Sequence, residues 1–328
     1  MDETALNDAI AALWRRSLGP ADRLDLTPCP VSGNNRVFVA RAADGREAVA
    51  KWYFTGPADR RDRLDAEWRL LAHAARAGVK AVPRPLARDD ARRLALHEFV
   101  QGDRPTQIGR AEVMAAAALF RALNERHADA DLPDAAEACF TGPAHVALME
   151  GRLSRLSAIR PDAEIDRQAI TLAAAMNDRW RRLRPRLADF GGEAGRCVSP
   201  SDFGFHNALR GPDGALRFID FEYAGWDDPA KTICDFFLQP AVPVDPVHRD
   251  AFVAAILDGR PDAAAVLARA RLLHPVFALK WCCIMLNPFV ADLASPSRFA
   301  DPAADRAERK RLQLAKAVAA FQTSSSGD

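Results

Sequence analysis

The stretch SPSDFGFHNALRGPDGALRFIDFEYAGWDDP, residues 199–229, is the most informative part of this chain. Asp202 precedes Asn207 in the form D-x-x-x-x-N, and Asp220 ends an apolar run further along. The turn-forming residues 211–214, Gly-Pro-Asp-Gly, favour a hairpin that returns Asp220 to the loop carrying Asp202. Phosphoryl transfer needs one carboxylate to accept a hydroxyl proton and oxygen ligands that hold Mg²⁺ against phosphates. One loop and one hairpin can supply these groups to a single site.

The first hundred residues have the pattern of a small β-sheet with helices beside it. The spacing of apolar residues predicts helices over residues 6–18 and 59–78. Alternating β-rich runs predict strands over residues 36–42, 47–53, 83–88 and 94–100. The dipeptide Asp44-Gly45 between the first two of these strands predicts a tight hairpin.

The pattern changes after Gln101-Gly102, where helical periodicity takes over. It predicts helices over residues 111–127, 145–158, 163–188, 250–258, 262–273 and 305–321. A β-like segment over residues 197–222 interrupts them. We therefore predict an α+β fold of two lobes, with a β-rich N-terminal lobe at residues 1–101 and a larger helical lobe at residues 102–328.

Composition excludes several classes of protein. The chain has 328 residues, 49% of them hydrophobic, and 45 basic residues nearly balance 44 acidic ones, so no global field points to nucleic acid. The six cysteines form no C-x-x-C pair, and no uninterrupted apolar run approaches the roughly 18 residues of a membrane span. We expect a reduced, cytoplasmic protein that does not bind nucleic acid or membrane. The sequence leaves the oligomeric state open.

With these motifs in place, the sequence resembles the aminoglycoside phosphotransferase and choline kinase family, within the protein-kinase-like fold. The family's catalytic loop reads H-x-D-x-x-x-x-N and is followed by I-D-[FWY]-[ED]. Here the matching segments are Pro200-Ser-Asp202 to Asn207 and Ile219-Asp220-Phe221-Glu222. One departure is that Pro200 stands where the family has the loop histidine, which supports the loop and does not transfer the proton.

The resemblance implies a role for each of these residues. Asp202 would be the catalytic base, Asn207 and Asp220 would hold Mg²⁺, and Glu222 would be a weaker candidate for the metal site. It also implies that Asp235 is a structural carboxylate beneath the catalytic loop.

The same resemblance extends to the N-terminal part and implies ATP as the nucleotide. Gly33, Asn34 and Asn35 lie between two predicted strands, where the family has its nucleotide loop. Lys51 lies in Val49-Ala50-Lys51, as in the kinase V-A-I-K pattern, and Glu67 lies on the next helix, where the family places its partner. Glu98 and Val100 match the lobe connection, where backbone groups would meet adenine.

Each of these residues also has a structural interpretation. Lys51 could be an edge-strand lysine, Glu67 a solvated helix residue, and Glu222 purely structural. Asp202 and Asn207 could cap turns, and His206 is favoured as a loop or packing histidine. The pair Cys282-Cys283 favours core packing over redox chemistry.

Together the motifs favour an ATP- and Mg²⁺-dependent kinase that phosphorylates a hydroxyl of a small molecule, such as a sugar or an amino alcohol. The alternative is a catalytically inactive nucleotide-binding or regulatory protein on the same fold. A protein kinase is disfavoured because Phe221-Glu222 differs from the Phe-Gly of that family and no A-P-E element follows. Residues 150–200 are rich in arginine, which disfavours a polycationic acceptor, while Tyr223, Trp226 and Trp281 could form an aromatic cage for a choline-like one.

Overall fold

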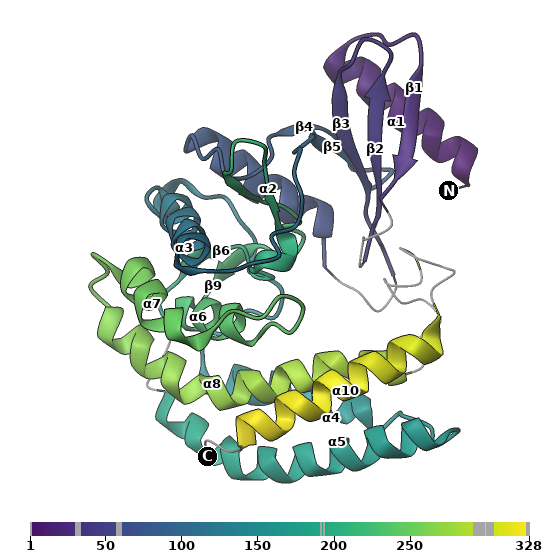
Figure 1. The fold of residues 1–328 in the computed structure, drawn as a ribbon. Coiled ribbons are helices and arrows are strands. Elements are labelled where there is room, and N and C mark those ends of the chain that lie inside the picture. Colours follow the sequence, from purple (N-terminus) through teal and green to yellow (C-terminus); the bar gives the residue numbers. More distant parts are fainter. Residues whose placement is uncertain are drawn as a thin grey trace.

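The computed structural model describes residues 2–29, 34–56, 61–190, 192, 194–290, 299 and 305–325. Its N-terminal part is one antiparallel five-stranded sheet in the order β1-β2-β3-β5-β4 (Figure 1). The strands are β1 (Leu24–Pro28), β2 (Arg36–Ala42), β3 (Glu47–Trp52), β4 (Pro85–Asp89) and β5 (Leu94–Glu98). The predicted hairpin at Asp44-Gly45 is confirmed, since β2 pairs with β3 and Gly45 adopts the left-handed φ of 87° that favours glycine at such turns.

Helix α1 (Glu3–Leu18) covers one face of this sheet. Its buried residues recur at helical spacing, with Leu6, Ile10, Leu13 and Trp14 on one side. They pack against the buried residues of β2, which alternate along the strand as a half-buried strand requires. This small core keeps the sheet rigid beneath the residues that the sequence assigns to the nucleotide.

Helix α2 (Arg63–Arg76) connects β3 to β4 and joins the two parts of the molecule. Asp62 caps its first turn by accepting a hydrogen bond from the Asp65 amide at 2.8 Å. Leu70, Leu71 and Ala74 on the helix belong to the large hydrophobic core of the helical part. The position of α2 is therefore fixed from both sides.

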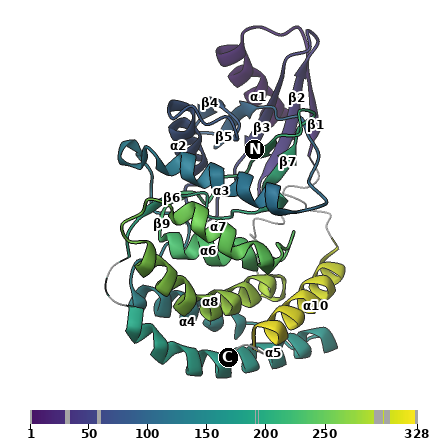
Figure 2. The same cartoon turned by 60° about the vertical axis from the view of Figure 1, so that its left-hand side comes forward.

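The helical part lies below the sheet in Figure 1 and is built around α8. Its α-helices are α3 (Arg110–Asn124), α4 (Gly142–Leu156), α5 (Glu164–Leu183), α6 (Pro229–Leu238), α7 (Arg249–Leu257), α8 (Ala263–Met285) and α10 (Arg306–Ser325). Figure 2 shows α6 on one side of α8 and α5 with α10 on the other, and all three helices contact it. The fold confirms the prediction of an α+β protein-kinase-like architecture. The boundary at residue 101 stays a prediction.

The helix that contains α8 corrects the expectation that no segment of the chain is long and apolar enough to span a membrane. Within the described chain, residues Ala263–Phe289 are long and apolar enough to cross a membrane by length and composition. The sequence test missed this segment because arginine, histidine and lysine side chains divide it into short apolar runs. Of its most apolar window, 61% is buried inside the protein, which is typical of a central core helix.

Two short ladders carry the segment that the sequence singled out. Strand β6 (Cys197–Ser199) pairs with β9 (Gly225–Asp227), and β7 (Ala208–Arg210) pairs with β8 (Leu216–Phe218). The second ladder is the predicted hairpin, closed by residues 211–214 with Gly214 at a φ of 76°. Its backbone lies against the segment after the sheet, because Asp103 and Arg210 exchange backbone hydrogen bonds of 3.1 and 2.8 Å. The hairpin is thereby fixed to the connection between the two parts.

Several elements differ from the sequence predictions. Strands β1 and β9 and helix α6 were not predicted, and α8 runs well past residue 273. Helix α8 continues through Pro275, although proline removes a backbone hydrogen bond within a helix.

Candidate functional site

The loop that follows β6 places Asp202, and side chains hold it where the family histidine is missing. Ser201 adopts a left-handed φ of 64°, and its amide donates to Ser199 Oγ at 3.1 Å. Lys231 Nζ donates to Ser201 Oγ at 3.2 Å and forms an ion pair with buried Asp227. The loop is thus held by a side chain of α6.

Asp202 follows Ser201 in this loop, and its side chain is 33% exposed. Its Oδ1 lies 3.2 Å from Nε2 of His206, so His206 contacts the predicted base. Asn207 Nδ2 donates to the backbone oxygen of Asp202 at 3.1 Å. Because the amide nitrogen of Asn207 is used in this bond, its side-chain oxygen is the atom that can serve as a metal ligand.

Asp220 follows β8 and is brought beside Asn207 by the hairpin. The Ile219 amide donates to the backbone oxygen of Asn207 at 2.8 Å, which extends the ladder to the residue before Asp220. Asp220 has a left-handed φ of 68°, unusual for a residue with a side chain, and such strain is typical of functional sites. Partial burial, together with the nearby Glu222 and Glu67, raises the pKa of Asp220 to about 6 against the opposing effect of Lys51.

Lys51 connects the sheet to this carboxylate. Its Nζ lies 2.6 Å from Glu67 Oε2 and 2.5 Å from Asp220 Oδ1, with the lysine only 5% exposed. Burial lowers the pKa of Lys51, but the three surrounding carboxylates outweigh that effect, so the net pKa is raised and the lysine stays charged. A single ammonium therefore joins β3, α2 and the end of β8.

Glu67 does more than pair with Lys51. Tyr53 donates its hydroxyl to Oε2 at 2.8 Å, and the Phe221 amide donates to Oε1 at 3.1 Å. Burial alone would raise the pKa of Glu67, but Lys51, His97 and these hydrogen bonds lower it overall. At 2% exposure, Glu67 does not fit the alternative of a solvated helix residue.

Glu222 lies at the point where the nucleotide loop meets the helical part. Its Oε1 accepts from Asn34 Nδ2 at 2.8 Å and lies 2.7 Å from Arg63 Nη1, and its Oε2 accepts from Asn35 Nδ2 at 2.5 Å. Gly33, also predicted for the nucleotide loop, lies outside the described residues. The structure therefore brings Asn34 and Asn35 within reach of the segment that carries Asp220.

At the predicted connection between the lobes, the side chains do not form a recognisable site. Glu98 Oε2 accepts from the Arg84 amide at 3.0 Å, so its side chain is used within the sheet. Val100 is half-buried, and its predicted role depends on backbone groups. Gly102 lies so close to the hairpin that a Cβ there would be 2.5 Å from the Arg210 carbonyl oxygen.

Asp235 has the surroundings of a structural carboxylate. Lys280 Nζ donates to Oδ2 at 2.9 Å and Trp281 Nε1 donates to Oδ1 at 2.8 Å, so α6 is bound to α8. Sequence reasoning did not assign Lys231 or Lys280, although a signal existed, since only six of the 45 basic residues are lysines. Lys51, Lys231 and Lys280 are all buried and ion-paired.

The oxygen ligands present fit Mg²⁺. Among the described residues no group of three or more His, Cys, Asp or Glu side chains could hold a metal by itself. Mg²⁺ usually takes one or two carboxylates and completes its coordination with water and substrate phosphates. Asp220 with the Asn207 amide oxygen is such a partial set.

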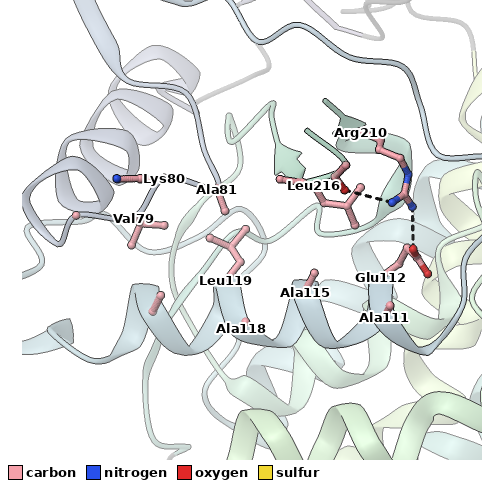
Figure 3. Close-up of a pocket in the computed structure, with 14 residues that line it drawn as sticks. Val79, Lys80, Ala81, Ala111, Glu112, Ala115, Ala118, Leu119, Arg210 and Leu216 are labelled. Atoms are coloured by element: carbon pink, nitrogen blue, oxygen red, sulfur yellow. Dashed lines mark hydrogen bonds and ion pairs between the residues drawn. The ribbon is translucent and has the colours of Figure 1, made fainter. Parts of the chain in front are cut away.

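A cavity of about 590 Å³ lies elsewhere, behind the β7–β8 hairpin (Figure 3). It is lined by Val79 and Ala81 before β4, by alanines of α3, and by Leu216, and it holds none of the described candidate site residues. At its edge Arg210 bridges Glu112 Oε1 at 2.8 Å and the Gly214 carbonyl at 3.3 Å. This contact fixes the hairpin to α3 and so supports the site from behind.

Comparison with known proteins agrees with this geometry. A family model described as the Phosphotransferase enzyme family matches residues 25–272. A search of curated proteins found no significant match. Among solved structures, a choline/ethanolamine kinase family protein from Mesorhizobium loti superposes with a TM-score of 0.60 at 18% identity, covering 96% of this chain and 94% of that one.

Two further solved structures have the same fold. A putative fructosamine-3-kinase from Thermobifida fusca gives a TM-score of 0.56 at 16% identity, with 96% and 99% of the two chains covered. A spectinomycin phosphotransferase in complex with ADP and spectinomycin gives 0.60 at 12% identity, with 96% and 98% covered. The family match spans well over half of the sequence, and the chain belongs to the Phosphotransferase enzyme family.

Proposed function

We propose that this protein is an ATP- and Mg²⁺-dependent kinase that transfers the γ-phosphoryl group to a hydroxyl of a small molecule. The observation that carries the proposal is the convergence of Lys51, Glu67 and Asp220 through contacts of 2.5 and 2.6 Å. Asn207 lies across the ladder from Ile219, the residue before Asp220, and Asp202 lies earlier in the same loop. An ammonium, a metal carboxylate and a base are the groups that phosphoryl transfer requires.

Each residue has a defined task in this proposal. Lys51, aimed by Glu67, binds the phosphates of the nucleotide. Asp220 and Asn207 hold Mg²⁺, which when bound neutralises charge on the phosphate oxygens. Asp202 orients the acceptor hydroxyl and accepts its proton as the phosphoryl group leaves ATP. The backbone at Glu98 and Val100 faces the adenine, and Asn34 and Asn35 lie over the phosphates.

An active enzyme is favoured over an inactive nucleotide-binding protein by the way the catalytic loop is held. Pro200 replaces the family histidine, but the loop is still held because Lys231 donates to Ser201 and forms an ion pair with Asp227. A spectinomycin phosphotransferase with this fold was solved with ADP, which supports nucleotide binding here.

The six cysteines are all free, which supports a reducing, cytoplasmic location.

The acceptor is best sought among sugars and other polyols, or anionic alcohols. A choline-like acceptor needs open aromatic faces for its cation. The Tyr223 ring already has the guanidinium groups of Arg61 and Arg63 at 5.1 and 5.0 Å. The Trp281 ring has Lys280 Nζ at 5.9 Å from its centre, and its Nε1 donates to Asp235. These two aromatic residues are therefore already engaged by the protein's own cations and acids.

An acceptor screen tests the proposal. Purified protein with Mg²⁺ and ATP is incubated with panels of sugars, amino alcohols and aminoglycosides, and ADP release is followed with Asp202→Asn as the blank. We expect at least one acceptor, from the sugar panel first, to raise ADP release and to gain one phosphoryl group by mass. ADP release that no acceptor raises, with wild type equal to the blank, would reject the kinase assignment.

A further inference from the structure

Glu222 is bound on both carboxylate oxygens by side chains from distant parts of the chain. Asn34 and Arg63 meet Oε1, and Asn35 meets Oε2, at 2.8, 2.7 and 2.5 Å. The neighbouring Tyr223 joins the same group, since its hydroxyl accepts from Asn34 Nδ2 and from Arg63 Nη1, both at 2.8 Å. We call these five residues the Glu222 clamp.

The clamp joins three elements, and residues 222–223 lie some 160 to 190 residues after the other members. Asn34 and Asn35 precede β2, Arg63 opens α2, and Glu222 and Tyr223 follow β8. Asn35 also accepts from the Phe54 amide at 3.0 Å, so the nucleotide loop is bound to the end of β3 as well. The helical part thereby sets where the loop lies over the sheet.

The burial of Glu222 sets it apart from Asp220. The Glu222 side chain is 1% exposed and faces an Arg63 side chain that is 0% exposed, whereas Asp220 is 38% exposed. A cation at Glu222 would have to displace the buried Arg63 guanidinium from this carboxylate, which is costly. Asp220 is more exposed, and its partner Lys51 keeps its ion pair with Glu67 when a cation takes its place.

We propose that Glu222 is a positioning residue that fixes Asn34 and Asn35, and that Asp220, and not Glu222, is the metal carboxylate of the site. This rests on the proposed kinase function and departs from the metal role that the sequence suggested for Glu222. The clamp contributes to nucleotide affinity by keeping Asn34 and Asn35 in place. Weakening it lowers the population in which these two residues are in place and reduces apparent affinity by the same factor, with or without metal.

The test measures ADP affinity by calorimetry, once in excess EDTA and once in saturating Mg²⁺. Glu222→Gln keeps the shape but removes the charge and sets an amide group against the Asn34 and Asn35 donors. We expect ADP to bind about tenfold more weakly in both conditions, with the gain from Mg²⁺ unchanged. Asp220→Asn is the reference for metal loss and should lose affinity only where Mg²⁺ is present. The clamp proposal would be overturned if Glu222→Gln bound ADP with wild-type affinity in EDTA and lost affinity only in Mg²⁺.

A matched control and a mild variant complete the design. Arg69 and Asp131 also connect α2 to the helical part, at 2.7 Å, but both are exposed, and the ion pairs described for Arg69 include none of the clamp residues. Arg69→Met should leave ADP affinity unchanged in both conditions, and a loss equal to that of Glu222→Gln would count against the clamp. Tyr223→Phe keeps the ion pair and the ring beside Arg63, so it should fold and show a smaller loss in EDTA than Glu222→Gln. Wild-type affinity of Tyr223→Phe would also count against the proposal.

Hydrogen exchange in the ligand-free protein separates this proposal from the proposed function. If wild type binds no ADP in either condition, the kinase assignment fails, but the clamp can still be measured. Peptides covering residues 34–54 should exchange at least about tenfold faster in Glu222→Gln and in Tyr223→Phe than in wild type, because the Phe54 amide loses its anchored partner. Equal exchange in all three proteins would overturn the clamp independently of nucleotide.

Discussion

A double-mutant cycle on Lys51 and Glu67 tests whether the buried pair acts as one unit. The perturbations are Lys51→Met, Glu67→Gln and both together. The two side chains are 5% and 2% exposed and lie 2.6 Å apart, so neither has water to replace its partner. Removing one member of such a pair costs about 3–5 kcal/mol of unfolding free energy, because it leaves the other charge buried.

The magnitudes expected for the single variants differ. Lys51→Met should cost about 3 kcal/mol, at the lower end, because Asp220, with its pKa raised to about 6, can neutralise itself by taking up a proton. Glu67→Gln should cost about 1–3 kcal/mol of unfolding free energy. The NH₂ group of the glutamine would face either the Tyr53 hydroxyl or the Phe221 amide, and both of these groups are themselves donors. The double variant should lose no more unfolding free energy than Lys51→Met alone, because a neutral amide replaces the carboxylate that would otherwise be buried without Lys51.

Urea denaturation of the four proteins gives the coupling free energy directly. We expect it to be about 1–3 kcal/mol, and kcat/KM for ATP should show the same lack of additivity. Costs that add within about 0.5 kcal/mol would refute the reasoning and leave Glu67 without a role in positioning Lys51.

Three further predictions follow from the site and its support. Asp220→Asn and Asn207→Ala should each raise the Mg²⁺ concentration needed for ATP to increase the melting temperature, and unchanged midpoints in both would reject their metal role. Gly102→Ala should destabilise the fold by about 1–3 kcal/mol in urea, because the new Cβ meets the Arg210 carbonyl at 2.5 Å, and a neutral effect would contradict that contact. Burial lowers the pKa of His145 to about 4, below its unfolded value of about 6.5, so the contribution of His145 to folding stability should be constant above pH 6.5 and fall by up to about 3 kcal/mol as the pH drops to 4. His145→Leu should flatten that part of the profile, and an identical slope would show that His145 does not cause it.

The parts of the fold that the sequence predicted are those set by local chemistry. Asp44-Gly45 determines a turn by its own backbone preferences, so β2 and β3 could be placed from the sequence. Asn207 and Asp220 flank the β7–β8 hairpin and Asp202 lies on the loop before Asn207, so their spacing along one short segment was enough to predict a shared site.

The missed elements show the limit of the same approach. Helix α6 carried a local signal, since Asp228 accepts from the Ala230 amide as its cap and Pro229 occupies the first turn. Next to a motif rich in loop residues, that signal was not used. Helix α8 was predicted to end at residue 273, but it continues through Pro275 because packing against neighbouring helices outweighs the local cost of a proline.

The contacts of Glu222 could not be predicted from the sequence at all. Its partners Asn34, Asn35 and Arg63 lie some 160 to 190 residues away, and no local pattern records which oxygen each one meets. The lysine contacts of the catalytic loop are similar, because Lys231 reaches Ser201 only once α6 has packed. Tertiary packing, rather than propensity, decides these contacts.

The most direct test of the proposed mechanism is Asp202→Ala, measured for both nucleotide binding and turnover. Asp202 contacts His206 through its side chain and Asn207 through its backbone oxygen, and it makes no contact with Lys51 or Asp220 among the described hydrogen bonds. With an acceptor identified, we predict ADP affinity within about twofold of wild type and kcat lower by about 10²–10⁴-fold, as for removal of a general base. Turnover within threefold of wild type, or ADP affinity lost in parallel with kcat, would contradict the assignment of Asp202 as the base.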